Sequence, residues 1–179
     1  MVRRAQRGLT LTELMVTVAI IAITAAVAFT SARTNASRSN RFFSQINSEM
    51  TRVRTQAIAS GREYLVTFAP TVVTVAWQDA ATGSGTFTTE RTYNAPAGVE
   101  IYGVNDSETA TPAVPNTFTN KSILFAPSGS VSDPATSGAM TGSTFFVYFA
   151  CTTLIDGQPE GQYAFGITTL TGKTIGSRW

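Results

Sequence analysis

The first 29 residues of the chain, MVRRAQRGLTLTELMVTVAIIAITAAVAF (residues 1–29), decide how the rest is interpreted. Three arginines precede Gly8, and an apolar segment follows it, but Glu13 interrupts that segment near its start. An acidic residue in the middle of a membrane helix costs about 2.5–3.5 kcal/mol on insertion scales. Any interpretation of this stretch must therefore give a reason for Glu13.

Two general interpretations fit the stretch incompletely. A secretory signal peptide has a basic start, an apolar middle and a small-residue cleavage site, and Ala26 to Ala28 would serve as that site. Thr10, Thr12 and Glu13 would then separate the basic part from the apolar part. A permanent membrane helix needs about 20 mostly apolar residues, and residues 9–29 are long enough for one.

A third interpretation accounts for Glu13, because the stretch resembles the amino terminus of type IV pilins and type II secretion pseudopilins. Those chains have a short basic leader that ends in Gly and a hydrophobic helix with Glu at its fifth position. Here the leader would end at Gly8, the mature chain would start at Leu9, and Glu13 would be the fifth mature residue. The resemblance implies cleavage after Gly8 by a prepilin peptidase and N-methylation of Leu9. For Glu13 we predict an assembly salt bridge to the methylated Leu9 amine of a neighbouring subunit, because an ionised acid in an apolar core needs a cation. The alternative is a Glu13–Leu9 contact within one chain, which a separation of four residues on a helix allows.

The charge of the chain changes sign when such a leader is removed. The full sequence has a formal net charge of +2. Without Arg3, Arg4 and Arg7, 10 of the 13 Lys and Arg remain against 11 Asp and Glu, a formal charge of −1. The basicity therefore indicates membrane topology more than a surface for nucleic acid.

An amphipathic helix is predicted to continue the apolar segment. Its apolar residues recur at steps of three and four, which is one face of a helix. They are Phe43, Ile46, Met50, Val53 and Ala57, and Gly61 follows as a plausible C-cap. No proline precedes Pro70, which predicts a helix with little interruption, although the Ser and Asn of residues 34–40 are mediocre helix formers.

Beyond Gly61 the pattern changes to that of short strands. Eight segments are rich in β-branched and aromatic residues and are separated by Gly, Pro, Asn, Asp and Ser. They are residues 63–69, 71–77, 86–93, 98–103, 122–126, 143–154, 161–169 and 172–179, with a long polar loop at 105–121. The predicted fold class is α+β, with a long amino-terminal helix packed on antiparallel sheets. The predicted divisions are a leader (1–8), a membrane and filament-core half of the helix (9–30), an amphipathic half (31–60) and a β-rich domain (61–179).

The second half of the chain resembles the GspH/FimT-type minor pilins and pseudopilins. The resemblance lies in RVRTQAIASGREYLVTFAP (residues 52–70), in ILFAPSGSVS (residues 123–132) and in the terminal TTLTGKTIGSRW (residues 168–179). It implies the type IV pilin fold. Some relatives bind DNA through a basic tail, which Lys173 and Arg178 match only in part. A last strand with one exposed Lys and one exposed Arg is the preferred interpretation.

Enzyme chemistry is the least expected function. The chain has no His, which removes Ser/His/Asp and Cys/His arrangements, and its single Cys, Cys151, is expected to be buried. GSGTFTTE, with Gly83 and Gly85, is interpreted as a hairpin turn. Four acids could join a Ca²⁺ site but are interpreted as solvated loop residues: Asp106, Glu108, Asp133 and Asp156. We expect no metal and no cofactor.

The sequence therefore predicts a minor pilin that packs into a type IV pilus near the tip, below the outermost subunit, and helps to start assembly. Alternatives are an H-type pseudopilin of type II secretion and a DNA-binding minor pilin for natural transformation. The expected partners are other pilin or pseudopilin subunits, the prepilin peptidase, the inner-membrane assembly platform and membrane lipid. The expected location is the inner membrane, with the β-rich domain in the periplasm, and then the filament.

Overall fold

The computed structural model describes residues 10–79, 85–105, 116–134, 144–151, 154–155, 158–159 and 161–178. The chain divides into two compact units, Met1–Thr34 and Asn35–Trp179. Helix α1, Leu11–Ser60, runs through 50 residues and contributes to both units. Its continuity confirms the prediction of a helix with little interruption, including the Ser- and Asn-containing residues 34–40. The side chains of residues 27–36 are outside the described set.

In the first unit, eight large apolar side chains of α1 are described, and all of them are exposed. Each of the eight is more than half exposed, and they point to all sides of the helix because consecutive positions are separated by about 100°. They are Leu11, Leu14, Met15, Val16, Val18, Ile20, Ile21 and Ile23. A helix that is apolar on all sides needs apolar surroundings. Over the described residues, we find no helix with the combined length and apolarity that a membrane crossing requires.

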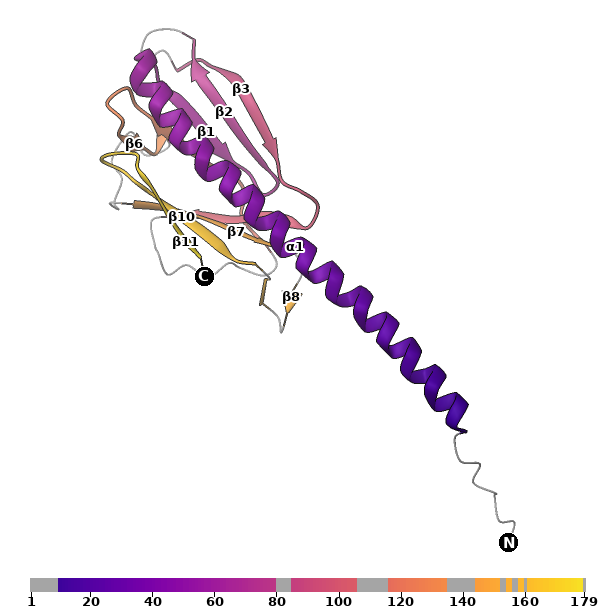
Figure 1. The fold of residues 1–179 in the computed structure, drawn as a ribbon. Helices are drawn as coiled ribbons and strands as arrows, with labels where there is room; N and C mark the ends of the chain where they lie inside the picture. The colour runs from indigo at the N-terminus through magenta and orange to yellow at the C-terminus, as the bar shows by residue number, and fades with distance from the viewer. Residues whose placement is uncertain are drawn as a thin grey trace. The chain divides into compact units, whose positions relative to one another are not determined.

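The second unit contains two antiparallel sheets beside the carboxyl half of α1 (Figure 1). The five-stranded sheet has the order β3-β2-β1-β5-β6, and the four-stranded sheet has the order β11-β10-β7-β4. A two-stranded ribbon joins β8 and β9. The strands are β1 Tyr64–Phe68, β2 Val72–Gln78, β3 Phe87–Asn94, β4 Val99–Asn105, β5 Lys121–Phe125, β6 Val131–Ser132, β7 Thr144–Cys151, β8 Leu154–Ile155, β9 Gln158–Pro159, β10 Tyr163–Thr168 and β11 Thr174–Arg178. The predicted fold class is confirmed.

The apolar stripe of α1 forms one wall of the core between the sheets. Ile46, Met50, Val53 and Ala57 are fully buried, as their spacing predicted. Phe42, 2% exposed, is the first buried apolar residue of the stripe, and the predicted Phe43 is only partly buried, with its ring centroid 5.4 Å from that of Tyr163. Because α1 contacts both sheets, its buried side chains cover a wider arc of the helix than the single predicted stripe. Each buried large side chain contributes about 1.5–3 kcal/mol.

All eight predicted strands are present, and three more were not predicted. Strands β6, β8 and β9 have two residues each, which is too short to show alternation. The predicted end of the helix is also confirmed, because Gly61 has φ 65° and its N–H donates to the Ala57 carbonyl at 3.1 Å. Residues 106–115 of the predicted polar loop lie outside the described set. Asn116, at its end, donates to a carboxylate oxygen of Glu100 at 2.9 Å.

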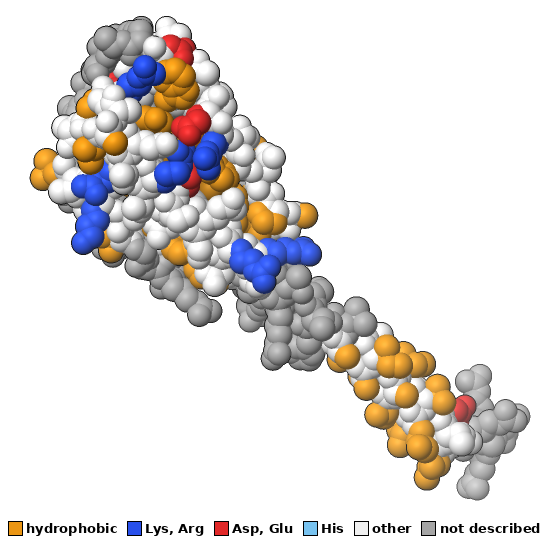
Figure 2. All heavy atoms as spheres, turned by 45° about the horizontal axis from the view of Figure 1, so that its top comes forward, with side chains coloured by type: hydrophobic (Ala, Val, Ile, Leu, Met, Phe, Trp, Pro, Cys, Tyr) orange, Lys and Arg blue, Asp and Glu red, His pale blue; other side chains and the backbone are white. Residues whose placement is uncertain are grey.

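An ion network ties α1 to the edge strand β3. The Arg52 Nε donates to Glu49 Oε2 at 2.8 Å, and its Nη1 lies 3.0 Å from Glu90 Oε1. The pairing register between β2 and β3 leaves Glu90 without an opposite residue, which forms a β-bulge. A bulge changes the direction of the side chain at the extra residue, here Glu90. Burial raises the pKa of Glu49, but hydrogen bonds from Arg52 and Tyr93 outweigh it and hold that pKa below its usual value. In Figure 2 acidic and basic side chains lie together on this face.

Two turns that are distant in sequence meet beside the end of α1. Gly129 lies in the turn before β6, and Gly172 lies in the turn between β10 and β11. The Val131 N–H donates to the Thr169 carbonyl at 2.7 Å, and a Cβ at Gly172 would lie 2.6 Å from the Gly129 oxygen. The same Cβ would lie 3.1 Å from Arg54 Cδ on α1. Two of the three segments that carry the resemblance in the second half therefore form one packed junction, and Arg54 of the third lies against it.

Gly172→Ala is expected to destabilise the chain more than Gly61→Ala. Both glycines have φ near +60°, where a Cβ is strained, but nothing lies within 4 Å of a Cβ at Gly61. We expect a loss of about 1 kcal/mol for Gly61→Ala and about 3 kcal/mol for Gly172→Ala, since only the second adds a backbone clash. Urea unfolding of the full chain in detergent measures both. Equal losses in the free energy of unfolding would show that the turns at Gly129 and Gly172 accommodate the added Cβ without a clash.

Candidate functional site

The candidate site lies at the amino end of α1, where Glu13 sits in the first turn. Gly8 and Leu9, the predicted cleavage and methylation residues, lie outside the described residues. Thr10 is the first described residue and directly precedes the helix, and its carbonyl accepts a hydrogen bond from the Leu14 N–H at 3.1 Å. Thr10 is therefore the N-cap, and Glu13 is the third residue of the helix.

Thr10 and Glu13 form a reciprocal capping pair. The Thr10 backbone N–H donates to Glu13 Oε2 at 2.9 Å, and the Glu13 backbone N–H donates to Thr10 Oγ1 at 3.3 Å. The Thr10 hydroxyl also donates to Glu13 Oε2 at 2.9 Å. This is the capping box, in which two backbone donors without helical partners are satisfied. A carboxylate here also interacts favourably with the positive end of the helix dipole.

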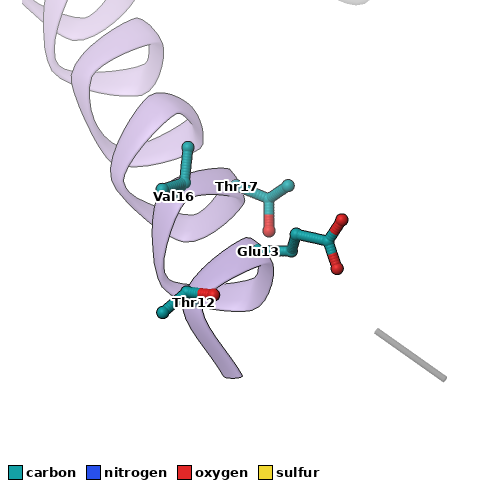
Figure 3. A pocket seen from close by; sticks show the side chains of 4 residues that line it. All are labelled: Thr12, Glu13, Val16 and Thr17. Carbon is teal, nitrogen blue, oxygen red and sulfur yellow. The ribbon is translucent and has the colours of Figure 1, made fainter. Parts of the chain in front are cut away.

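The capping pair uses one carboxylate oxygen of Glu13. Among the described residues, Oε1 of Glu13 accepts no hydrogen bond. Figure 3 shows the carboxyl group extending away from the helix, on the same side as Thr17. Thr12, Glu13, Val16 and Thr17 line a depression on the helix surface. A cation from outside the helix can thus approach the carboxylate without displacing the cap.

The local role of Glu13 was readable from the sequence. Thr10 and Glu13 have the S/T-x-x-E spacing that marks a helix start, but only the Leu9 amine was predicted as a partner of the acid. The intermolecular salt bridge remains a prediction. The capping pair gives Glu13 a stabilising contact within its own chain, which lowers the cost of keeping an acid beside an apolar segment.

The basic tail does not form a described site. Lys173 is exposed, and its backbone N–H donates to Thr168 Oγ1 at 3.2 Å in the turn before β11. Arg178 pairs in register with Tyr163 at the end of β11, and its side chain is outside the described set. The structure therefore places the two residues at opposite ends of one strand. DNA contact by them remains an untested prediction.

One prediction about the acids is wrong. Asp133 is not a solvated loop residue, because it is 5% exposed and its carboxylate forms an ion pair with Lys121. The acid was misjudged because the two residues of β6 that precede it were not recognised as a strand. The other three candidate acids, Asp106, Glu108 and Asp156, lie outside the described residues, as do Gly83 and the Cys151 side chain. In the described part of the chain, no three His, Cys, Asp or Glu gather as they would around a metal ion.

Thr10→Ala is expected to loosen the first turn of α1. Loss of the N-cap hydroxyl costs about 1 kcal/mol, which corresponds to roughly fivefold faster hydrogen exchange at the first-turn amides of the full chain in micelles. Thr12→Ala is the matched control, because among the described residues its hydroxyl shares a hydrogen bond with Thr10 Oγ1, at 3.0 Å, and bonds no backbone group of the first turn. Unchanged exchange at Glu13 and Leu14 in Thr10→Ala would contradict the capping geometry.

Comparisons with known proteins support the resemblance of the amino terminus to that of prepilins. Residues 3–29 match the family model of the prokaryotic N-terminal methylation motif. A search of curated proteins finds no match to the chain.

Two similar solved structures are the type IV minor pilin FimU of Pseudomonas aeruginosa and the minor pseudopilin EpsH from the Type 2 Secretion System of Vibrio cholerae. FimU has 12% identity and a TM-score of 0.45, over 83% of this chain and 92% of its own. EpsH has 13% identity and a TM-score of 0.47, over 82% of this chain and 96% of its own. The chain thus carries the methylation motif of prepilins in residues 3–29, as its resemblance implied.

Proposed function

We propose that the chain is a minor pilin of a type IV pilus, a non-enzymatic subunit that enters the filament and helps to start its assembly. The observation that carries the proposal is the methylation motif in residues 3–29, with Glu13 placed in the first turn of α1. In this proposal the peptidase removes residues 1–8, and Leu9 becomes the methylated amino terminus. A type II secretion pseudopilin of the H type is the second candidate, because it would carry the same motif.

The exposed apolar part of α1 supports the proposal that the subunit moves from the membrane into the filament. Its eight large apolar side chains need lipid or other apolar helices around them. We infer that residues 9–30 lie first in the inner membrane and then in the filament core. The amphipathic residues 31–60 and the β-rich residues 61–179 lie on the periplasmic side. The assembly platform of the inner membrane transfers the subunit between the two environments.

Glu13 is proposed to select the docking register. Its free oxygen Oε1 can accept the methylated amine of Leu9 from a neighbouring subunit, which stays cationic because methylation keeps the nitrogen basic. A buried carboxylate without a cation costs several kcal/mol, so only the register that pairs the two charges is favourable. The outermost subunit has no neighbour beyond it to pair with. We therefore place this chain near the tip but below the outermost subunit.

Processing by the prepilin peptidase tests the proposed function directly. Intact-mass analysis of the full chain, expressed with a prepilin peptidase, should show loss of residues 1–8 and addition of one methyl group at Leu9. Gly8→Val should remain unprocessed, because a β-branched residue restricts the backbone that must enter the protease. Cleavage after Ala28 would instead identify a secretory signal peptide and overturn the proposal.

Glu13→Leu should be processed and retained in the membrane but should join other subunits poorly. Removing the charge favours the bilayer and removes the docking partner of the Leu9 amine. Copurification with the partner minor subunits is expected to fall at least tenfold. Thr10→Ala is the matched control, since it weakens the cap and keeps the charge. If Thr10→Ala lowers copurification as much as Glu13→Leu does, the acid acts as a helix cap only.

A further inference from the structure

Arg38 and Arg41 are exposed arginines on α1 that have no ion-pair partner among the described residues. Three other arginines of the second unit have partners, whereas the buried Nε of Arg54 has none among the described residues. Arg52 binds Glu49 and Glu90, Arg91 lies 3.6 Å from Glu90, and Arg62 lies over the Trp77 ring at 4.6 Å. Figure 2 shows a group of basic side chains that lies apart from the mixed acidic and basic group.

The sequence around the pair supplies no acid. No Asp or Glu occurs between Glu13 and Glu49, and Glu49 is already bound to Arg52. Arg38 and Arg41 are three residues apart, so they are neighbours on the helix surface and repel each other. An anion bound between them would relieve that repulsion. The exposed side chains beside them, Ser37, Asn40 and Ser44, are uncharged hydrogen-bond formers that suit an oxyanion.

Arg38 and Arg41 are exposed although they lie next to buried positions of α1. Ser39 and Phe42 are buried, and the Ser39 hydroxyl donates to the Gly161 carbonyl at 3.2 Å. At about 100° per residue, Arg41 lies about 100–160° from these positions and from Ile46, whereas Arg38 lies only about 40° from Phe42. Both arginines are nevertheless exposed. The two guanidinium groups are therefore available to a partner outside the domain.

We propose that Arg38 and Arg41 bind the phosphate groups of anionic phospholipids at the membrane surface that faces the β-rich domain. The proposal rests on the proposed membrane location of residues 9–30, which the two arginines follow along the chain. Guanidinium groups bind phosphate oxygens in pairs, and basic residues next to a membrane segment are attracted to anionic headgroups. A lipid leaflet also presents several phosphate groups side by side, so each of the two adjacent arginines can bind one.

Lipid retention by the full chain tests this site. The processed chain is placed in nanodiscs with equal amounts of phosphatidylglycerol and phosphatidylethanolamine, and the lipids that remain bound are measured by native mass spectrometry. We expect retained phosphatidylglycerol to exceed phosphatidylethanolamine by about fivefold for each arginine, with the preference decreasing in high salt. Arg38→Gln with Arg41→Gln should abolish the preference. Lys173→Gln, which removes an exposed cation elsewhere, should keep it.

Two results would overturn the site. An equal lipid ratio for the wild-type chain, or an unchanged preference in the double variant, excludes anionic lipid as the partner. If the double variant keeps the preference but loses copurification with other subunits, the arginines bind an acidic protein surface instead. Processing and disc insertion are measured in the same samples. A processed and inserted chain without lipid preference removes only this inference, whereas a chain that is neither processed nor inserted removes the proposed function as well.

Discussion

The burial of one helical stripe between two sheets is the interaction on which the domain depends. Ile46, Met50, Val53 and Ala57 are fully buried on α1, and the core around them takes residues from both sheets. Neither sheet has a closed core without the helix, because the stripe supplies one wall of the common cluster. The ion network of Arg52 then fixes the same helix to the edge strand β3. The carboxyl half of α1 is therefore a structural part of the β-rich domain.

The amino end of the same helix differs from the carboxyl half in what surrounds its apolar side chains. There the large apolar side chains are exposed, and the only acid of the segment is held by the N-cap residue. The capping pair satisfies backbone donors of the first turn and leaves Glu13 Oε1 without a partner in the described chain. A local and an intermolecular role of Glu13 are thus compatible, since they use different oxygens. The cap also restrains the side chain, which reduces the entropy lost when a partner binds.

The fold followed from the sequence wherever an element was long enough to be recognised. The apolar stripe of α1 repeats at steps of three and four, and each of the eight predicted strands has at least five residues, enough for its β-branched and aromatic composition to stand out. The two-residue strand β6 shows no period, and the burial of Asp133 behind it was missed for that reason. The packing of Gly129 against Gly172 joins segments 43 positions apart, and no local rule predicts such a contact. The capping box of Thr10 and Glu13, in contrast, was visible and was overlooked.

The distribution of acids along α1 connects these observations. Within the helix, acids occur only at positions 13 and 49, and both are bound by groups of their own chain, Thr10 in one case and Arg52 in the other. The stretch between them carries only positive charge, at Arg33, Arg38 and Arg41. Arg38 and Arg41 have no ion-pair partner among the described residues, and like charges three residues apart on a helix repel each other. Negative charge from another molecule or from lipid would relieve this repulsion, so the charge pattern of this helix suits an element at a boundary.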